Sequence, residues 1–253
     1  MSSRLQRLLS LVPPDCPSVA DIGCDHALVA RALCKERPLT ERVFAVDRSE
    51  AALSAALDES AGPLALSRQP TFVLGDGLSP LLCEGTVHTV ICAGMGCQST
   101  IHILNAGAMS LLSVQRLVLQ PWPSYLLPHS ALFKHAQRLG FDFDAQFIDF
   151  ENSVHYITTS FTRTASLDHS NNSVSEIDVF RRSPLFKRYM CGDLSNTDCT
   201  KDESWEGEID LWKQYLTMQL ADLSVRRRQS PLSERYDVVQ DYHSELTAIL
   251  KTL

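Results

Sequence analysis

The sequence predicts an α/β fold with a mainly parallel, doubly wound sheet, followed by a C-terminal helical hairpin. Short apolar segments recur through the first 120 residues and several end in Asp or Gly, while helical patterns separate them. This alternation is typical of parallel sheets. Beyond residue 208, apolar side chains repeat at steps of three or four, which indicates helices. A chain of 253 residues with 44% hydrophobic content is long enough for one such domain and a small appendage.

Seven strands are expected in the sheet. The segments that contain the five parallel strands, with the turns that follow them, are 19–27, 42–47, 72–77, 89–96 and 116–120. A helix around 130–139 should end at Gly140. After it, 141–150 and 154–161 predict an antiparallel pair that closes the sheet. An amphipathic helix over 3–9 begins the chain.

Three parts are expected along the chain. They are a ligand-binding domain, a polar linker with insertions, and a helical hairpin, at 1–163, 164–207 and 208–253. Residues 166–173 are too polar to pack. Two apolar series predict the hairpin helices, and Ser230 with Pro231 would cap and begin the second. The two series are Ile209, Trp212, Leu216, Leu220 and Leu223, then Leu232, Tyr236, Val239, Leu246, Leu250 and Leu253.

The turn after the first predicted strand is the most informative stretch. Apolar residues run into Asp21 and Gly23, and then into Asp25 and His26, where a dinucleotide-binding loop would have another Gly. Gly23 allows a sharp turn beside a ligand, and Asp21 can accept hydrogen bonds from an ammonium group or a neighbouring loop. A nicotinamide-dependent oxidoreductase would need G-x-G-x-x-G here, which Gly23–Leu28 lacks.

Further acids and glycines follow the other parallel strands, at the edge where such sheets bind ligands. Asp47 comes about two dozen residues after Gly23, where a carboxylate can bind the two ribose hydroxyls of a nucleoside cofactor. Asp76, next to Gly77, could bind an adenine amino group. The same ligand is expected to lie beside Ala93, Gly94 and Met95. This order predicts S-adenosyl-L-methionine as the cofactor and methyl transfer as the reaction.

Four sequence motifs are more specific than this general pattern. They are Ala20–Gly23 with Asp25–Ala27, then Leu74–Leu78, Ala93–Gly96 and Leu119–Pro121. With them the chain resembles the bacterial-type tRNA (adenine-22, N1) methyltransferases, the TrmK type, from Ser3 to about Phe161 and more loosely beyond. The resemblance implies a class I S-adenosyl-L-methionine-dependent methyltransferase with a Rossmann-like sheet and a coiled-coil-like C-terminal hairpin. It also implies adenine N1 of tRNA as the acceptor.

The chain departs from that family at two positions expected near the rim of the acceptor pocket. Cys97 replaces a second Gly after Gly96, and Trp122 stands where the family usually has Asn. Polar insertions also interrupt 164–176 and 191–207. The departures leave the target nucleotide open but not the cofactor. Two alternatives remain: another acceptor, such as a different RNA position, a protein or a small molecule, and a catalytically inactive RNA-binding relative.

Asp25 and His26 are the expected catalytic residues. The N1 lone pair of adenine is free at neutral pH, so the enzyme needs to position the base and to place a carboxylate or carbonyl near the developing positive charge. Asp25 would orient the exocyclic amine or stabilise that charge, or else stabilise its own loop. His26 would orient Asp25 or the loop.

The expected tRNA-binding residues come from three regions. Gly96 would complete a backbone wall with Gly94 and Met95 beside the transferred methyl group, or form a structural turn. Aromatic side chains would stack on an extruded base, unless they pack in the core. An arginine cluster would contact phosphates or lie on a solvated helix face. These further residues are Gln120, Pro121, Trp122, His155, Tyr156, Arg226, Arg227 and Arg228.

Charge and cysteine content narrow the function classes. The formal net charge of -7 argues against a general nucleic-acid binder, although a local basic face is compatible with it. The eight cysteines have no CxxC pair and no zinc-site spacing, so we expect no metal and a reducing, cytoplasmic location, with an organelle as the alternative. No apolar run reaches the length of a membrane span. We expect a monomer.

Overall fold

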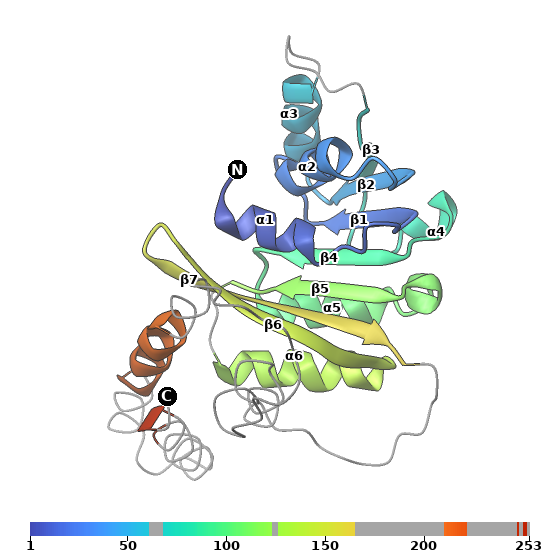
Figure 1. Ribbon diagram of the computed structural model, residues 1–253. Helices are drawn as coiled ribbons and strands as arrows, with labels where there is room; N and C mark the ends of the chain where they lie inside the picture. Colours follow the sequence, from blue (N-terminus) through green and yellow to red (C-terminus); the bar gives the residue numbers. More distant parts are fainter. Residues whose placement is uncertain (61–67, 123–125, 165–209, 222–246, 248–249, 252–253) are drawn as a thin grey trace. The chain divides into compact units, whose positions relative to one another are not determined.

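A computed structural model describes residues 1–60, 68–122, 126–164, 210–221, 247 and 250–251 (Figure 1). By its internal contacts the chain divides into two compact units. The first is Met1–Phe147 with Tyr156–Asn171, and the second is Ile148–His155 with Asn172–Leu253. The sheet belongs to the first unit, except for the tip of its last hairpin.

A seven-stranded sheet with the order β3-β2-β1-β4-β5-β7-β6 forms the centre of the first unit (Figure 1). The strands are β1 Ser18–Ile22, β2 Arg42–Asp47, β3 Thr71–Leu74, β4 Thr89–Ala93, β5 Arg116–Gln120, β6 Phe141–Glu151 and β7 Val154–Arg163. The first five are parallel, and β7 pairs antiparallel with β5. The predicted sheet is thereby confirmed, including its closing antiparallel pair.

Helices connect the parallel strands. They are α1 Ser3–Ser10, α2 Leu28–Glu36, α3 Glu50–Ser60, α4 Leu81–Glu84, α5 Cys97–Ala106 and α6 Leu126–Arg138, with a 3-10 turn at Ser110–Ser113. The Ser2 hydroxyl caps α1 by accepting a hydrogen bond from the Leu5 backbone N–H at 3.3 Å. Helix α6 begins earlier than the 130–139 that the sequence predicted, because Pro128 falls in its first turn, where no backbone N–H is needed.

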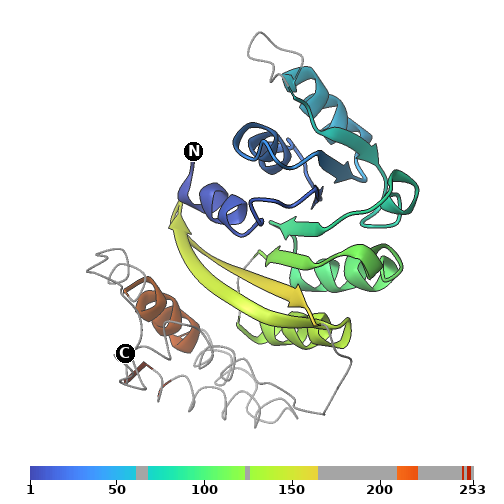
Figure 2. The same ribbon diagram turned by 45° about the vertical axis from the view of Figure 1, so that its right-hand side comes forward.

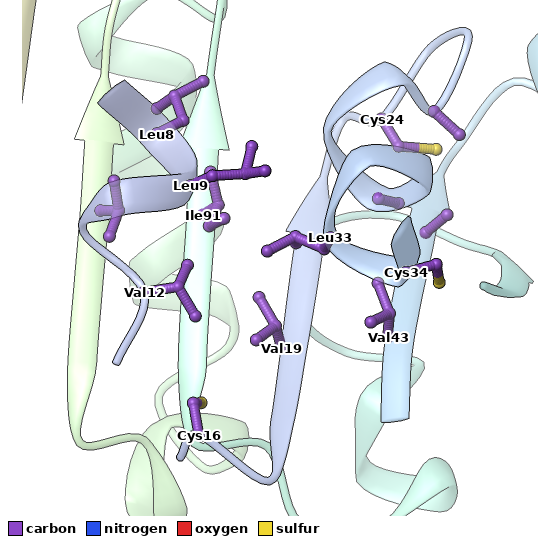
Figure 3. Packing of buried hydrophobic residues seen from close by; sticks show 14 of the residues in the cluster. Leu8, Leu9, Val12, Cys16, Val19, Cys24, Leu33, Cys34, Val43 and Ile91 are labelled. Carbon is purple, nitrogen blue, oxygen red and sulfur yellow. The ribbon is translucent and has the colours of Figure 1, made fainter. Parts of the chain in front are cut away.

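Side chains alternate between two covered faces of the sheet. On one face Val19, Val43 and Ile91 pack with Leu33 of α2 and with Leu8 of α1 (Figure 3). Figure 2 shows α1 and α2 together on one side of the sheet and α5 and α6 together on the other, in agreement with their contacts. Both faces are therefore buried, as expected for a doubly wound sheet.

Three buried cysteines belong to this cluster. Burial raises the pKa of the Cys16, Cys24 and Cys34 thiols, to about 12 for Cys24. The cysteines of the described ranges are free, and all but Cys83 are buried. The prediction that several cysteines pack as small hydrophobic residues is confirmed for this part of the chain.

The second unit is described in part. Residues 210–221 are helical, which confirms the first predicted helix of the C-terminal segment over that range, and residues 247, 250 and 251 are helical as well. Trp212 and Tyr215 are buried and meet edge to face, with ring centroids 5.8 Å apart. The predicted linker, the rest of the second helix and the seam between the two helices lie outside the described residues.

Candidate cofactor and acceptor site

A cavity of about 740 Å³ opens at the carboxyl ends of β1, β2 and β3 and against α5. The strand order reverses between β1 and β4, and open α/β sheets bind ligands at such a switch point. The cavity is lined by Ile22, Gly23, Asp25, Val46, Asp47, Arg48, Ser49, Ala52, Gly75, Asp76, Gly77, Met95, Gly96, Gln98, Ser99, His102 and Ile103. Seven residues predicted for the site are among them: Gly23, Asp25, Asp47, Asp76, Gly77, Met95 and Gly96.

The loop after β1 is held against β2 by its backbone. The Gly23 and Cys24 N–H groups both donate to the Val46 carbonyl, at 2.9 and 3.1 Å. Gly23 has φ +71°, and a Cβ there would lie 2.8 Å from Met95 Sδ, so both the conformation and the space require glycine. Asp25 has φ 47°, which is unusual for a residue with a side chain and is found at functional loops.

Asp47, at the end of β2, is positioned by two backbone groups. Its Oδ2 accepts a hydrogen bond from the Asp25 N–H at 3.0 Å, and its Oδ1 accepts one from the Ser49 N–H at 2.9 Å. Each carboxylate oxygen has a second lone pair. The carboxylate is therefore fixed and can still accept two hydroxyl groups, as a ribose diol would require.

Asp76 lies in a tight turn after β3. Gly75 has no room for a Cβ, which would meet Pro80 Cγ at 2.7 Å, and Gly77 has φ +60° with Ile103 Cγ2 3.0 Å from the same position. The turn therefore needs both glycines. Within the described part of the chain no group pairs with the Asp76 carboxylate, which is exposed on the cavity lining and free to accept from an amine.

Asp21 lies beneath the β1 loop and is not among the lining residues. Its Oδ2 accepts a hydrogen bond from the Ala30 N–H of α2 at 3.2 Å, and the residue is buried. Burial raises the pKa of Asp21 to about 7; the Ala30 N–H opposes this rise, and the negative charge of Asp47 adds to it. Its predicted contact with an ammonium group stays a prediction.

The two predicted catalytic residues have exposed side chains. The side chains of Asp25 and His26 are 75% and 55% exposed, and 3.9 Å separates Asp25 Oδ2 from His26 Nε2. That distance is too long for a hydrogen bond. Asp25 lines the cavity and its backbone is anchored on Asp47, whereas His26 is not part of the lining.

The turns after β4 and β5 are tied together by backbone hydrogen bonds. The Gly94 N–H donates to the Gln120 carbonyl at 2.8 Å, and the Trp122 N–H donates to the Met95 carbonyl at 2.9 Å. Gly94 needs glycine because its φ is +80°, whereas a Cβ at Gly96 would meet nothing closer than 3.9 Å. The predicted wall beside the acceptor is thus held in place by two strands.

The predicted acceptor residues differ in exposure. Gln120 and Pro121 are buried, and Trp122 is 47% exposed. Both ends of the Gln120 side chain already have partners: Oε1 accepts from Arg4 Nε at 2.5 Å, and Nε2 donates to Thr158 Oγ1 at 2.6 Å. Cys97 is buried at the start of α5, between the cavity-lining residues Gly96 and Gln98, so its expected place near a pocket rim stays a prediction.

His155 and Tyr156 belong to different units. Tyr156 carries the Arg4 guanidinium 4.5 Å above its ring. In the second unit, the His155 ring meets the Phe150 ring at 4.7 Å and the Tyr215 ring at 5.8 Å, and burial lowers the pKa of His155. These contacts favour the core-packing alternative for His155. Arg226, Arg227 and Arg228 lie outside the described residues.

One side of α5 was missed by reasoning from the sequence. Gln98, Ser99, His102 and Ile103 line the cavity, as does Arg48 after β2. The α5 residues have the spacing of one helix face. The sequence signal that could have found these α5 residues is the glycine turn Gly94–Gly96, if a helix had been predicted to begin directly after it.

An open α/β sheet with acids at the ends of β2 and β3 and a cavity at the switch point defines a nucleoside-binding protein of the doubly wound class. A family model described as a methyltransferase domain matches residues 1–154, and the chain belongs to this family. This excludes the nicotinamide alternative. A comparison with curated proteins found no match.

Several solved structures share the fold. The M. capricolum TrmK in complex with S-adenosyl-homocysteine is 18% identical, with a TM-score of 0.72 over 100% of this chain and 98% of that one. The B. subtilis m1A22 tRNA methyltransferase TrmK is 18% identical, with a TM-score of 0.67 over 99% and 98%. The magnesium protoporphyrin IX methyltransferase of Synechocystis, with bound SAM, is 22% identical, with a TM-score of 0.51 over 64% and 77%.

Two further properties concern only the residues that the structure describes. Within them, no helix is long and apolar enough to cross a membrane. In the same ranges, no group of three or more His, Cys, Asp or Glu side chains could hold a metal ion.

Proposed function

We propose that this methyltransferase-family protein methylates N1 of adenine in tRNA, at position 22 by likeness, with S-adenosyl-L-methionine as the methyl donor. The observation that carries the proposal is the extent of the structural likeness. Both TrmK enzymes match 98% or more of each chain, whereas the porphyrin methyltransferase matches 64% of this one. The likeness to tRNA enzymes therefore extends beyond the part that methyltransferases share.

The cavity residues suit the proposed cofactor. When bound, S-adenosyl-L-methionine supplies a methyl group on a sulfonium that a neutral nucleophile can take. Asp47 would accept the ribose hydroxyls with the lone pairs that the Asp25 and Ser49 amides leave free. Asp76, exposed and unpaired in the described part of the chain, would accept the adenine amino group. Gly23 lets the β1 loop pack directly against Met95, because a Cβ at this position would meet Met95 Sδ at 2.8 Å.

Asp25 is the residue proposed to act on the acceptor. Its backbone is anchored on Asp47, the residue lines the cavity and its side chain stays exposed, so its carboxylate can meet an incoming base. It would orient the adenine amine and offset the positive charge that develops on the ring. His26, 3.9 Å away, would bias the Asp25 rotamer rather than take a proton.

The test is nucleoside mass spectrometry on unmodified tRNA after incubation with the protein and S-adenosyl-L-methionine. N1-methyladenosine should form with the wild-type protein and should be lost when adenine 22 is replaced by guanine. Asp47→Ala should abolish the signal at low cofactor concentration and recover part of it at high concentration. Methylation at another position or of another base would refute the proposed target while leaving the methyltransferase class intact.

The tRNA-binding role of Arg226–Arg228 remains a proposal as well. Replacing the three arginines by Ala should weaken tRNA binding without changing the affinity for the cofactor. The slope of the logarithm of the binding constant against the logarithm of salt concentration should become shallower, by up to the equivalent of about three phosphate contacts. An unchanged salt dependence would assign the cluster to a solvated helix face. We also propose that the protein is a monomer and is located in the cytoplasm. Analytical sedimentation tests the monomeric state.

A further inference from the structure

We propose that the Arg4 guanidinium binds a phosphate of the acceptor nucleic acid at the carboxyl ends of β4 and β5. The proposal rests on a phosphate-bearing acceptor, as in the function proposed above, and adds a binding residue to that site. Arg4 belongs to α1, far from the cofactor acids in sequence. Its position is set by residues of β5 and β7.

Arg4 is held in one orientation by neutral groups. Its Nε donates to Gln120 Oε1 at 2.5 Å, and Gln120 in turn donates to Thr158 Oγ1 at 2.6 Å. Gln120 and Thr158 are fully buried, so this chain of hydrogen bonds is rigid. The Tyr156 ring lies under the guanidinium, 4.5 Å from Arg4 Cζ. The side chain is thus preorganised, which reduces the entropy lost when it binds a ligand.

The positive charge of Arg4 is not balanced within the described ranges. No carboxylate there forms an ion pair with it; its contacts are an amide oxygen and an aromatic ring. One of its five N–H donors is used, and the two terminal nitrogens keep theirs. Nη2 lies 3.6 Å from the position that a Cβ would take at Gly94. A planar pair of donors on a fixed cation matches the geometry of an oxyanion.

The location favours the acceptor over the cofactor as the source of that oxyanion. The cavity is lined from the ends of β1, β2 and β3, the start of α3, the turn after β4 and α5, with no residue from α1, β5 or β7. Arg4 stands on the β5 and β7 side, beside Gly94, whose chain neighbour Met95 lines the cavity. A phosphate on Arg4 would also neutralise the cation, which otherwise would oppose the positive charge that develops on a methylated adenine.

Arg7 offers a matched control. It carries the same charge on the same helix, one turn later, but its guanidinium lies over the Phe147 ring at 4.2 Å. A general loss of positive charge from α1 would affect both positions equally. A specific phosphate contact would affect Arg4 alone.

The first experiment compares adenosine 5′-monophosphate with adenosine as ligands, by NMR titration in the presence of saturating S-adenosyl-homocysteine. The wild-type protein and Arg7→Ala should bind the monophosphate about tenfold or more tightly than adenosine, the scale of a charge-assisted hydrogen bond. Arg4→Ala should bind both equally, and Arg4→Lys should keep part of the preference. The same preference in Arg4→Ala and wild type would overturn the proposal.

The second experiment uses tRNA with a neutral methylphosphonate linkage next to the target adenine. Neutralising this phosphate should lower kcat/KM about tenfold to a hundredfold in the wild type and less than threefold in Arg4→Ala. Equal losses in both would show that Arg4 does not contact this phosphate and would overturn the assignment. Calorimetry should find that wild type and Arg4→Ala bind S-adenosyl-L-methionine equally, which also shows that the variant is folded. A lower cofactor affinity in Arg4→Ala would mean that the oxyanion bound by Arg4 belongs to the cofactor and not to the acceptor.

The two proposals fail in different ways. If the wild type forms no N1-methyladenosine on tRNA but prefers the monophosphate through Arg4, the proposed target is wrong and the Arg4 site stands. If methylation occurs and the preference is absent, the Arg4 site alone is wrong.

Discussion

Substituting Asp21 by Asn should make the ligand-free protein more stable above neutral pH. The Asp21 carboxyl is buried, and burial raises its pKa from 3.8 to about 7. The folded state therefore keeps the proton between these values while the unfolded state has lost it, so the free energy of unfolding falls as pH rises from about 4 to 7. Above pH 7 the loss is complete. Asn keeps an oxygen for the Ala30 N–H and carries no charge.

The size of the effect follows from the pKa rise. A shift from 3.8 to about 7 corresponds to about 4 kcal/mol of unfolding free energy, an upper figure for one buried group. Urea unfolding without cofactor, at pH 5 and at pH 8.5, measures it. Asp21→Asn should gain up to that amount at pH 8.5 and much less at pH 5. Asp58→Asn, an exposed carboxylate on α3, is the matched control and should follow the wild type at both pH values.

Cofactor binding on the same variant tests why a buried acid stands there. If Asp21 serves the ammonium group of S-adenosyl-L-methionine, Asp21→Asn should bind the cofactor less tightly although it is more stable, a trade between stability and function. The reasoning is refuted if the wild-type and Asn proteins lose stability in parallel between pH 5 and pH 8.5. Lower stability of the Asn variant at both pH values would mean that the fold needs the carboxyl itself.

Three further predictions concern the cavity. Asp47→Ala should weaken S-adenosyl-L-methionine binding about tenfold to a hundredfold in calorimetry, because the ribose acceptor and the anchor of the Asp25 and Ser49 amides are both lost; unchanged affinity would remove Asp47 from the cofactor site. Asp25→Ala should lower the single-turnover rate about a hundredfold with smaller changes in either binding constant, and Asp25→Asn separates charge from shape, since a near-wild-type rate would mean that the negative charge is not needed. Gly23→Ala should lower Tm by several degrees and weaken cofactor binding, because φ at Gly23 is +71° and the new Cβ would meet Met95 Sδ at 2.8 Å. Gly96→Ala should keep the wild-type Tm, since the nearest atom to its Cβ would be 3.9 Å away. Equal losses of Tm in the two variants would contradict this assignment.

Much of the fold and part of the site follow from local sequence pattern. A short apolar run that ends in Asp47 or in Gly75–Gly77 can be recognised as a strand with its turn. Burial on both faces of the sheet requires a continuous apolar run, and a positive φ favours glycine, so both signals lie within a few residues of the sequence. The five parallel strands and the closing pair therefore match the prediction. Asp47 and Asp76 line the cavity for the same reason: in a parallel sheet, the ends of successive strands meet at one edge.

The tertiary structure decided what depends on contacts between distant segments. Arg4 and Gln120 are 116 residues apart, so no local pattern shows that one side chain holds the other. The burial of Asp21 and its raised pKa depend on α2 covering the strand end, and the part of α5 in the cavity depends on the helix angle after Gly96. The sequence alone determined which elements form and which ends carry acids, because propensity and period act over a few residues. Only the folded chain determined which side chains are desolvated, paired or left charged, since these properties arise from neighbours that the packing brings together.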